Sequence, residues 1–180
     1  TDGTHETGDA DELEAESLLA LAATDVDVYT IGLKGDYDES KLQVLASSAD
    51  NFLIAEESSQ LVEAFGQIDI LVYNSGVLWV ASVAETTDEI WEKTLDVNLV
   101  GAARTVREVL NRGRMLERKQ GRIIFISSEA GKIGELGLSA YSASKHGMLG
   151  LIRCLGLELG PEGITANAVC PVVNSVRSSG

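Results

Sequence analysis

Residues 121–145 read GRIIFISSEAGKIGELGLSAYSASK and combine a buried strand, a serine-bearing loop and the start of a helix. The apolar run at residues 123–126 is continuous, which is typical of a parallel strand covered on both faces. Ser128 follows that strand, and Tyr141 and Lys145 lie four residues apart, so they share one helix face. An ammonium beside a phenol favours the phenolate, so we expect Lys145 to lower the pKa of Tyr141 from its usual value near ~10. The pattern indicates a tyrosine that acts as a general acid or base.

Short apolar runs before and after this stretch in the sequence predict further strands of a parallel sheet. Helical patterns separate five predicted strands, so the fold class is α/β: a three-layer, Rossmann-like or flavodoxin-like parallel sheet of about five strands with helices on both faces. We expect the strand order 2-1-3-4-5, with the functional site at the carboxyl ends of the strands. The predicted strands cover residues 26–33, 51–56, 68–74, 122–127 and 165–170.

Three segments carry a family resemblance: FGQIDILVYNSG (65–76), DVNLVG (96–101) and the stretch from ISSEAG through YSASK to NAVCP (126–171). Together they resemble the short-chain dehydrogenases/reductases. The resemblance covers residues 65–171. It implies catalytic roles for Ser128, Tyr141, Lys145 and Asn98, with Asn98 holding a water in a proton relay. For Asn98 an exposed polar position in the helix is the alternative interpretation.

The same resemblance implies a cofactor, NAD or NADP, and a small-molecule substrate that is an alcohol/carbonyl pair. It would place Asn74, Gly76 and Lys145 beside the cofactor, while plain turn chemistry explains Asn74 and Gly76 equally well. The family's segment N-N-A-G has an asparagine where this chain has Tyr73. No residue that would choose between NAD and NADP can be assigned.

The family's glycine-rich segment T-G-x-x-x-G-x-G, which approaches the cofactor pyrophosphate, has no counterpart. Residues 7–14 (TGDADELE) carry acidic side chains where glycines are needed. The turn expected after the first strand offers Gly32, Lys34 and Gly35, but the carboxylates that follow would repel an anion, so an ordinary acid-capped turn is favoured. The resemblance also ends at Pro171, so the family's C-terminal strand and substrate-covering loop are expected to be missing.

The first third differs in charge from the rest of the chain. Residues 1–65 hold 16 acidic and 2 basic side chains, and residues 66–180 hold 12 of each, so the net charge of −14 lies entirely in the first part. The order of patterns from TDG (1–3) onward resembles the closing part of a von Willebrand factor type A domain. We therefore expect one composite α/β domain, 1–180, joined near residue 65 by natural fusion or by engineering. That resemblance makes Asp2 a weak metal-binding candidate, with a solvated terminus favoured.

Composition excludes several classes. With 44% hydrophobic and 23% charged residues the chain is expected to be globular and, without a visible signal peptide or spanning segment, cytoplasmic. Its acidity argues against nucleic-acid or anionic-membrane partners. Cys154 and Cys170 have no metal or disulfide spacing and are expected to be reduced core thiols. An apolar stripe along residues 148–159 suits either core packing or a homo-oligomer.

A long helix is predicted to open with a capping box formed by Thr86 and Glu89. The basic residues near its end are expected to form a solvated face. Three functional hypotheses follow from the whole chain. The first is an NAD(P)-dependent oxidoreductase impaired by the missing glycine loop, the second a non-catalytic composite or designed scaffold, and the third, weaker one a metal-dependent adhesion module.

Overall fold

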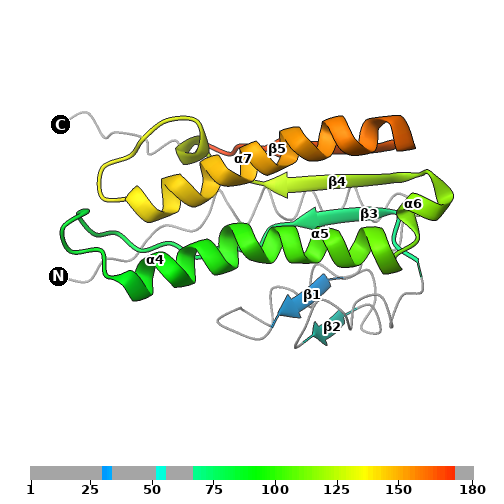
Figure 1. Cartoon of the computed structure of the whole chain (residues 1–180). Helices are drawn as coiled ribbons and strands as arrows, with labels where there is room; N and C mark the ends of the chain where they lie inside the picture. Colours follow the sequence, from blue (N-terminus) through cyan, green and yellow to red (C-terminus); the bar gives the residue numbers. More distant parts are fainter. Residues whose placement is uncertain (1–29, 34–51, 56–66, 173–180) are drawn as a thin grey trace, which may run out of the picture. The chain divides into compact units, whose positions relative to one another are not determined.

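The computed structural model describes residues 30–33, 52–55 and 67–172. The chain divides into two compact units, Thr1–Gln60 and Leu61–Gly180. In the first unit β1 (Thr30–Leu33) and β2 (Phe52–Ala55) pair in parallel, with Thr30 opposite Phe52. In the second unit three strands form a parallel sheet in the order β3-β4-β5 (Figure 1). They are β3 (Ile70–Tyr73), β4 (Gly121–Ile126) and β5 (Ile164–Val169).

All five predicted strands are present, each within a few residues of its expected bounds. The pairing of β1 with β2 and the order β3-β4-β5 agree with the expected 2-1-3-4-5. The step from β1 to β3 joins the two units and stays a prediction. One expectation was wrong: Gly32 lies inside β1 rather than in the turn that follows it, because the strand extends to Leu33.

The predicted long helix is one continuous run with an irregular centre. It consists of α4 (Asp88–Leu95), a π-helical turn, η2 (Asp96–Val100), and α5 (Gly101–Arg112). The predicted capping box was wrong by one residue. Thr87 is the N-cap and its side chain accepts from the Ile90 N–H, whereas the Thr86 hydroxyl donates to the Ser82 carbonyl 2.8 Å away.

The other helices connect and cover the strands. α6 (Met115–Arg118) leads into β4, and the 3-10 turn η3 (Glu129–Gly131) follows that strand. The longest helix, α7 (Ser139–Leu159), ends in the turn η4 (Gly160–Glu162) before β5. Gly163 follows at a φ of +75°, a left-handed conformation that glycine adopts without strain. Pro161 and Gly163 thus mark the end of the helix.

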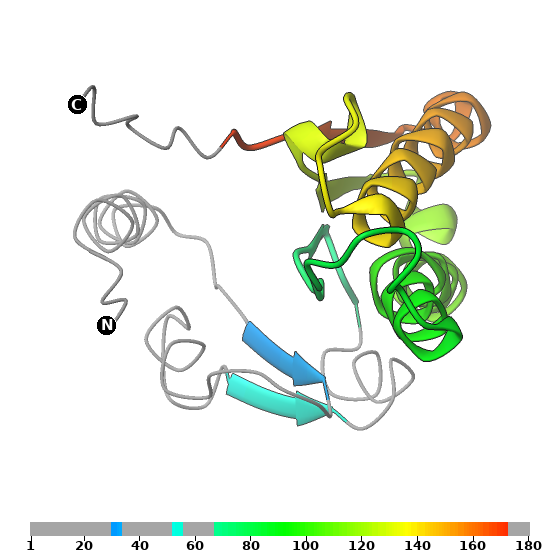
Figure 2. The same ribbon diagram turned by 90° about the vertical axis from the view of Figure 1, so that its left-hand side faces the viewer.

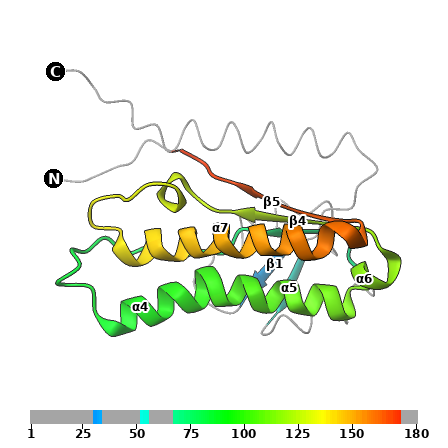
Figure 3. The ribbon, with the colours of Figure 1, turned by 45° about the horizontal axis from the view of Figure 1, so that its top comes forward.

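Helices α5 and α7 pack on the same face of the β3-β4-β5 sheet (Figures 2 and 3). Between them and the sheet lies a core that is fully closed to solvent at Phe125, Ile123, Met115 and Met148. This core fixes the carboxyl end of β4 against the first half of α7, where the candidate site residues lie. The expectation of helices on the second face falls outside the described residues.

Two surface expectations can also be compared with the structure. The basic side chains around α5 and α6 are largely paired with acids, for example Arg104 with Asp96 and Arg114 with Glu117, as suits a solvated face. Cys154 was expected in the core and is exposed on α7, because it faces away from the sheet. Among the described residues, no helix is long and apolar enough to cross a membrane.

Candidate active site

Lys145 is buried in the first half of α7, with only 3% of its surface exposed. Its Nζ donates to the carbonyl of Ile126, the last residue of β4, at 2.9 Å. Burial lowers the pKa of Lys145, because the charged form loses water, and the nearby Cys170 thiol partly opposes that shift. The Ser127 hydroxyl donates to the Lys145 backbone carbonyl at 3.2 Å and so ties the helix to the strand end. The ammonium is therefore held at the carboxyl end of the sheet.

Tyr141 lies one helical turn before Lys145 and is half-buried. The Lys145 Nζ is 5.6 Å from the centroid of the Tyr141 ring, within the range of an attractive cation–π contact. The structure therefore brings these two residues together on one face of α7, as their spacing predicted. Tyr141 is more exposed than Lys145, so its side chain remains partly accessible.

Asn98 lies in the π turn η2 and is completely buried. Its Oδ1 accepts from the Val77 N–H at 2.7 Å, and its Nδ2 donates to the Val77 carbonyl at 3.0 Å and to the Ser144 Oγ at 2.9 Å. The Ser144 hydroxyl donates in turn to the Tyr141 carbonyl at 2.7 Å. The alternative of an exposed polar position for Asn98 was wrong, because these three bonds satisfy the amide inside the protein.

Gly76 and Asn74, both expected beside a cofactor, differ in whether they border Lys145. A Cβ built on Gly76 would lie 3.5 Å from both the Asn98 Oδ1 and the Lys145 Nζ, so this glycine borders the cluster directly. Asn74 is exposed, and its side chain takes no part in the hydrogen bonds that join Asn98, Ser144 and Lys145 among the described residues. Of the two, only Gly76 is brought to the lysine.

Ser128 is the second residue after β4 and caps the short turn η3. Its Oγ accepts from the Ala130 N–H at 3.1 Å, which leaves the hydroxyl hydrogen free to donate elsewhere. The turn η3 packs closely on α7: a Cβ on Gly131 would lie 2.7 Å from the Ser127 Oγ and 3.0 Å from the Lys145 carbonyl. Local capping and this close approach together fix Ser128 at the strand end.

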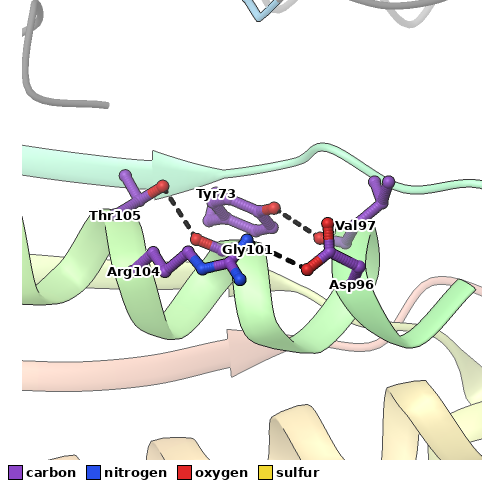
Figure 4. A network of polar contacts seen from close by, with 6 residues as sticks. All are labelled: Tyr73, Asp96, Val97, Gly101, Arg104 and Thr105. Carbon is purple, nitrogen blue, oxygen red and sulfur yellow. Dashed lines mark hydrogen bonds and ion pairs between the residues drawn. The ribbon is translucent and has the colours of Figure 1, made fainter. Parts of the chain in front are cut away.

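Sequence reasoning missed two polar side chains that shape the site. Ser144 is fully buried and links Asn98 to the Tyr141 backbone; a polar residue at a buried helix position was the available signal. Tyr73, seen only as a departure from the family pattern, donates from its hydroxyl to the Val97 carbonyl at 2.6 Å (Figure 4). Burial, helped by the Asp96 carboxylate, raises the pKa of Tyr73 to about 12, so its phenol stays a donor at neutral pH.

Two loops of apolar character border this edge of the sheet. The Ala81 N–H donates to the Gly137 carbonyl at 3.0 Å, and Ala81 and Leu138 form an isolated parallel β-bridge, so the loop after β3 and the loop before α7 are joined. We call their exposed large apolar side chains the apolar rim. The rim consists of Leu78, Val80, Val83, Ile133 and Leu136.

Within the described residues, no group of three or more His, Cys, Asp or Glu side chains could hold a metal ion. Asp2, the weak candidate of the sequence, lies outside the described residues.

Comparison with known proteins gives one consistent answer. The family model described as short chain dehydrogenase matches residues 43–178, which begins upstream of the predicted junction at residue 65. The chain is 42% identical over 154 residues to a protein of Streptomyces virginiae assigned as the ketoacyl reductase of the monensin polyketide synthase. That alignment covers 86% of this chain and 59% of the relative. A D-beta-hydroxybutyrate dehydrogenase of Cupriavidus necator is 33% identical over 177 residues, covering 92% of this chain and 67% of that protein.

Solved structures agree with these relatives. The crystal structure of an F189W actinorhodin polyketide ketoreductase with NADPH superposes with a TM-score of 0.71 at 37% sequence identity. The superposition covers 81% of this chain and 60% of that one, so the chain spans about three fifths of the length of such relatives. Three findings agree: the Rossmann-like α/β fold, the sequence segments in the family's order, and a family match over most of the chain. The chain belongs to the short-chain dehydrogenase family.

Proposed function

We propose that this chain carries the proton-transfer site of an NAD(P)-dependent oxidoreductase that interconverts an alcohol and a carbonyl compound. One observation supports the proposal above the others: a buried lysine ammonium lies 5.6 Å from the ring of a partly accessible tyrosine at the carboxyl end of a parallel sheet. An ammonium near a phenol oxygen favours its negative charge, which is what a tyrosine acid needs when it gives up its proton, and Lys145 is the cation that lies on the same helix face as Tyr141.

In the direction of carbonyl reduction, the Tyr141 hydroxyl gives its proton to the substrate oxygen. The Ser128 hydroxyl, whose oxygen already accepts from the Ala130 N–H, donates to the same oxygen and stabilises its developing negative charge. The Lys145 ammonium stabilises the resulting tyrosinate. Both Asn98 N–H groups are bound to protein acceptors, so its side chain fixes the shape of the site around Tyr141 and Lys145.

The residues present fit the ribose end of NAD or NADP. Lys145 Nζ has three donors, and one of them goes to the Ile126 carbonyl, so further N–H groups are available for ligand hydroxyls. Gly76, which borders the same ammonium, leaves space that a larger side chain would fill. When bound, NAD(P) supplies or accepts the hydride. The sequence assigns no residue to the choice between NAD and NADP, and it offers no glycine-rich segment for the pyrophosphate.

The apolar rim favours a carbonyl substrate with an apolar substituent. Five large apolar side chains from two joined loops are exposed beside the site, an arrangement that commonly marks a ligand-binding or partner surface. The names of two relatives, a ketoacyl reductase and a hydroxybutyrate dehydrogenase, suit an acyl chain carrying a ketone or hydroxyl group. We therefore propose a small-molecule ketone with an apolar tail as the substrate class.

The second hypothesis, a non-catalytic composite, stays a prediction. The charge step near residue 65 and the missing glycine-rich segment favour it, whereas the family match from residue 43 extends into the part that resembles a von Willebrand factor type A domain. The adhesion module built on Asp2, the homo-oligomer and the cytoplasmic location likewise remain predictions.

Replacing Tyr141 by Phe tests the proposed function. We expect calorimetry to detect saturable binding of NADPH or NADH to the whole chain, and spectrophotometry to detect oxidation of the reduced cofactor with an acyl ketone. Tyr141→Phe should lower kcat by at least about 100-fold, the usual contribution of a positioned acid, while cofactor binding stays unchanged.

Ser142→Ala is the matched control, because Ser142 is in the same turn of α7 and its buried hydroxyl has no partner among the described residues. Its turnover should equal that of the original chain. Turnover that survives Tyr141→Phe would refute the role of Tyr141. A folded chain that binds neither cofactor would refute the oxidoreductase and favour the non-catalytic composite.

A further inference from the structure

Tyr73 connects the sheet to the helix that carries Asn98. Its ring is 4% exposed and meets the Phe125 ring edge-on, with centroids 6.0 Å apart. The ring therefore belongs to the core, but its hydroxyl reaches past the core to the backbone of the π turn η2. There it donates to the Val97 carbonyl at 2.6 Å (Figure 4).

The π turn makes this carbonyl available. In an α-helix the Gly101 N–H would donate to the Val97 carbonyl, four residues back. Here it donates to the Asp96 carbonyl, five residues back. The wide turn thus releases Val97 from its ordinary partner, and the Tyr73 hydroxyl supplies a donor from a different element. A phenol with a pKa of about 12 keeps its proton for this bond throughout the neutral range.

Gly101 leaves the space that the hydroxyl occupies. A Cβ built on Gly101 would lie 2.6 Å from the Tyr73 Oη, closer than real contacts allow, and 3.2 Å from the Asp96 carbonyl. The next atom of the Tyr73 ring, Cζ, would be 3.8 Å away, which is an ordinary contact. The conflict is therefore with the hydroxyl rather than with the ring, and Tyr73 and Gly101 form a matched pair.

Asn98 depends on the geometry of this turn. A π turn holds one extra residue, so it shifts the side chains on one side of it by about 100° relative to those on the other. The side chain of Asn98 can bind Val77 and Ser144 while the buried face of α5 still packs on the sheet. If the turn relaxed to α geometry, Asn98 and α5 could not both keep their present partners.

We propose that Tyr73 is a positioning residue: its hydroxyl stabilises the π turn and thereby the orientation of Asn98 in the site. The catalytic part of this inference rests on the proposed function, whereas the structural coupling between Tyr73 and Asn98 does not. Tyr73→Phe keeps the ring in the core and removes only the hydroxyl, so it separates the hydrogen bond from the packing.

Nuclear magnetic resonance of the whole 15N-labelled chain tests the coupling directly. In Tyr73→Phe, the two Nδ2 protons of Asn98 should exchange with solvent about three- to tenfold faster, the range expected for loss of one hydrogen bond. Backbone amides in the centre of β4 serve as the internal reference. If turnover is detected, kcat should fall by a similar factor while KM for the cofactor stays within about twofold, a split that general loss of stability would not produce.

Thr105→Val is the matched control. Thr105 is one turn along the same helix, and its hydroxyl donates to the Gly101 carbonyl at 2.9 Å, so the substitution also removes one buried hydroxyl bond (Figure 4). It should leave the Asn98 amide protons as protected as before. Unchanged Asn98 exchange in Tyr73→Phe, or equal acceleration in Thr105→Val, would overturn the proposal. Absent turnover in the original chain would refute the proposed function alone.

A double substitution adds an independent check. Gly101→Ala should lower the midpoint of thermal unfolding in the original chain, because the Cβ meets the Tyr73 hydroxyl. In the Tyr73→Phe background the same change should have a smaller effect or raise the midpoint, since only the 3.2 Å approach to the Asp96 carbonyl remains and alanine favours a helix. Equal effects in both backgrounds would contradict the matched pair.

Discussion

Lys145 is held in a place that is unfavourable for its charge. Taking an ammonium out of water costs free energy, and one carbonyl hydrogen bond from Ile126 offsets only part of that cost. The lowered pKa expresses the same imbalance, because burial disfavours the charged form. We infer that this lysine is kept for the chemistry of the site rather than for the stability of the fold.

Lys145→Met should therefore abolish turnover and leave the free energy of unfolding at pH 7 unchanged or higher, since Met fills a similar volume without a charge. Between the lowered pKa of Lys145 and the usual 10.5, the unfolded chain binds more protons than the folded one, so the Lys145 contribution to stability rises with pH. The free energy of unfolding of the original chain should thus rise relative to that of Lys145→Met as the pH approaches 10.5. Urea unfolding at several pH values measures it.

Lys132→Met is the control for that series, because Lys132 is exposed and should show no such pH-dependent difference. A large loss of stability at pH 7 in Lys145→Met would contradict the argument.

For individual residues, the sequence predicted those contacts that depend on spacing within one helix or strand. Tyr141 and Lys145 share a helix face because they are four residues apart, and the structure brings them together. The partners of Asn98 could not be predicted in this way. Val77 and Ser144 are 21 and 46 residues from it in the sequence, and only the tertiary fold brings them to Asn98, Val77 from the loop after β3 and Ser144 from α7.

Among the elements, the short turn η3 controls how β4 meets α7. A Cβ on Gly131 would lie 2.7 Å from the Ser127 Oγ and 3.0 Å from the Lys145 carbonyl, and the second of these is helix backbone that cannot easily move. Gly131→Ala should therefore destabilise the protein by about 1–3 kcal/mol, the usual cost of overpacking. Circular dichroism during urea unfolding would measure the change.

Gly134→Ala is the control in the same loop, because a Cβ there meets nothing within 4 Å. Its unfolding free energy should stay within about 0.5 kcal/mol of the original. Equal losses of unfolding free energy for the two substitutions would mean that the close contact between η3 and α7 does not restrict the side chain at residue 131.

Among helices and strands, the sequence predicted the strand positions but not the π turn or the exact N-cap. Strand positions followed from short continuous apolar runs, which are typical of strands in a parallel sheet. The π turn at Asp96–Val100 left no such signal, because the hydroxyl that binds its Val97 carbonyl belongs to Tyr73, on a strand 24 residues earlier. The N-cap was placed on Thr86 instead of Thr87 because two adjacent threonines satisfy the same local rule, and only the backbone conformation distinguishes them.

For the whole molecule, charge is the dominant feature. The net charge is −14, and residues 1–65 account for all of it. Like charges repel within a compact chain, and salt screens that repulsion over about 10 Å at 0.1 M. Raising NaCl from 10 to 300 mM at pH 7 should therefore raise the midpoint of thermal unfolding. A gain of about 1 kcal/mol would correspond to roughly 2–4 °C in a chain of this size.

Differential scanning calorimetry measures this effect, and pH provides its control. At pH 5, close to the sequence pI of about 4.4, the same salt series should give a smaller rise, because fewer net charges remain to be screened. A midpoint that falls with salt at pH 7 would show that attractive ion pairs outweigh the repulsion.

The bridge between Ala81 and Leu138 has a consequence for engineering this protein. Because main-chain bonding joins the loop after β3 to the loop before α7, neither loop keeps its shape independently of the other. A graft that transplants one loop from a relative, to alter the proposed substrate preference, would leave its new backbone without the matching strand partner. Loop libraries for this scaffold should therefore exchange both segments together, as one cassette.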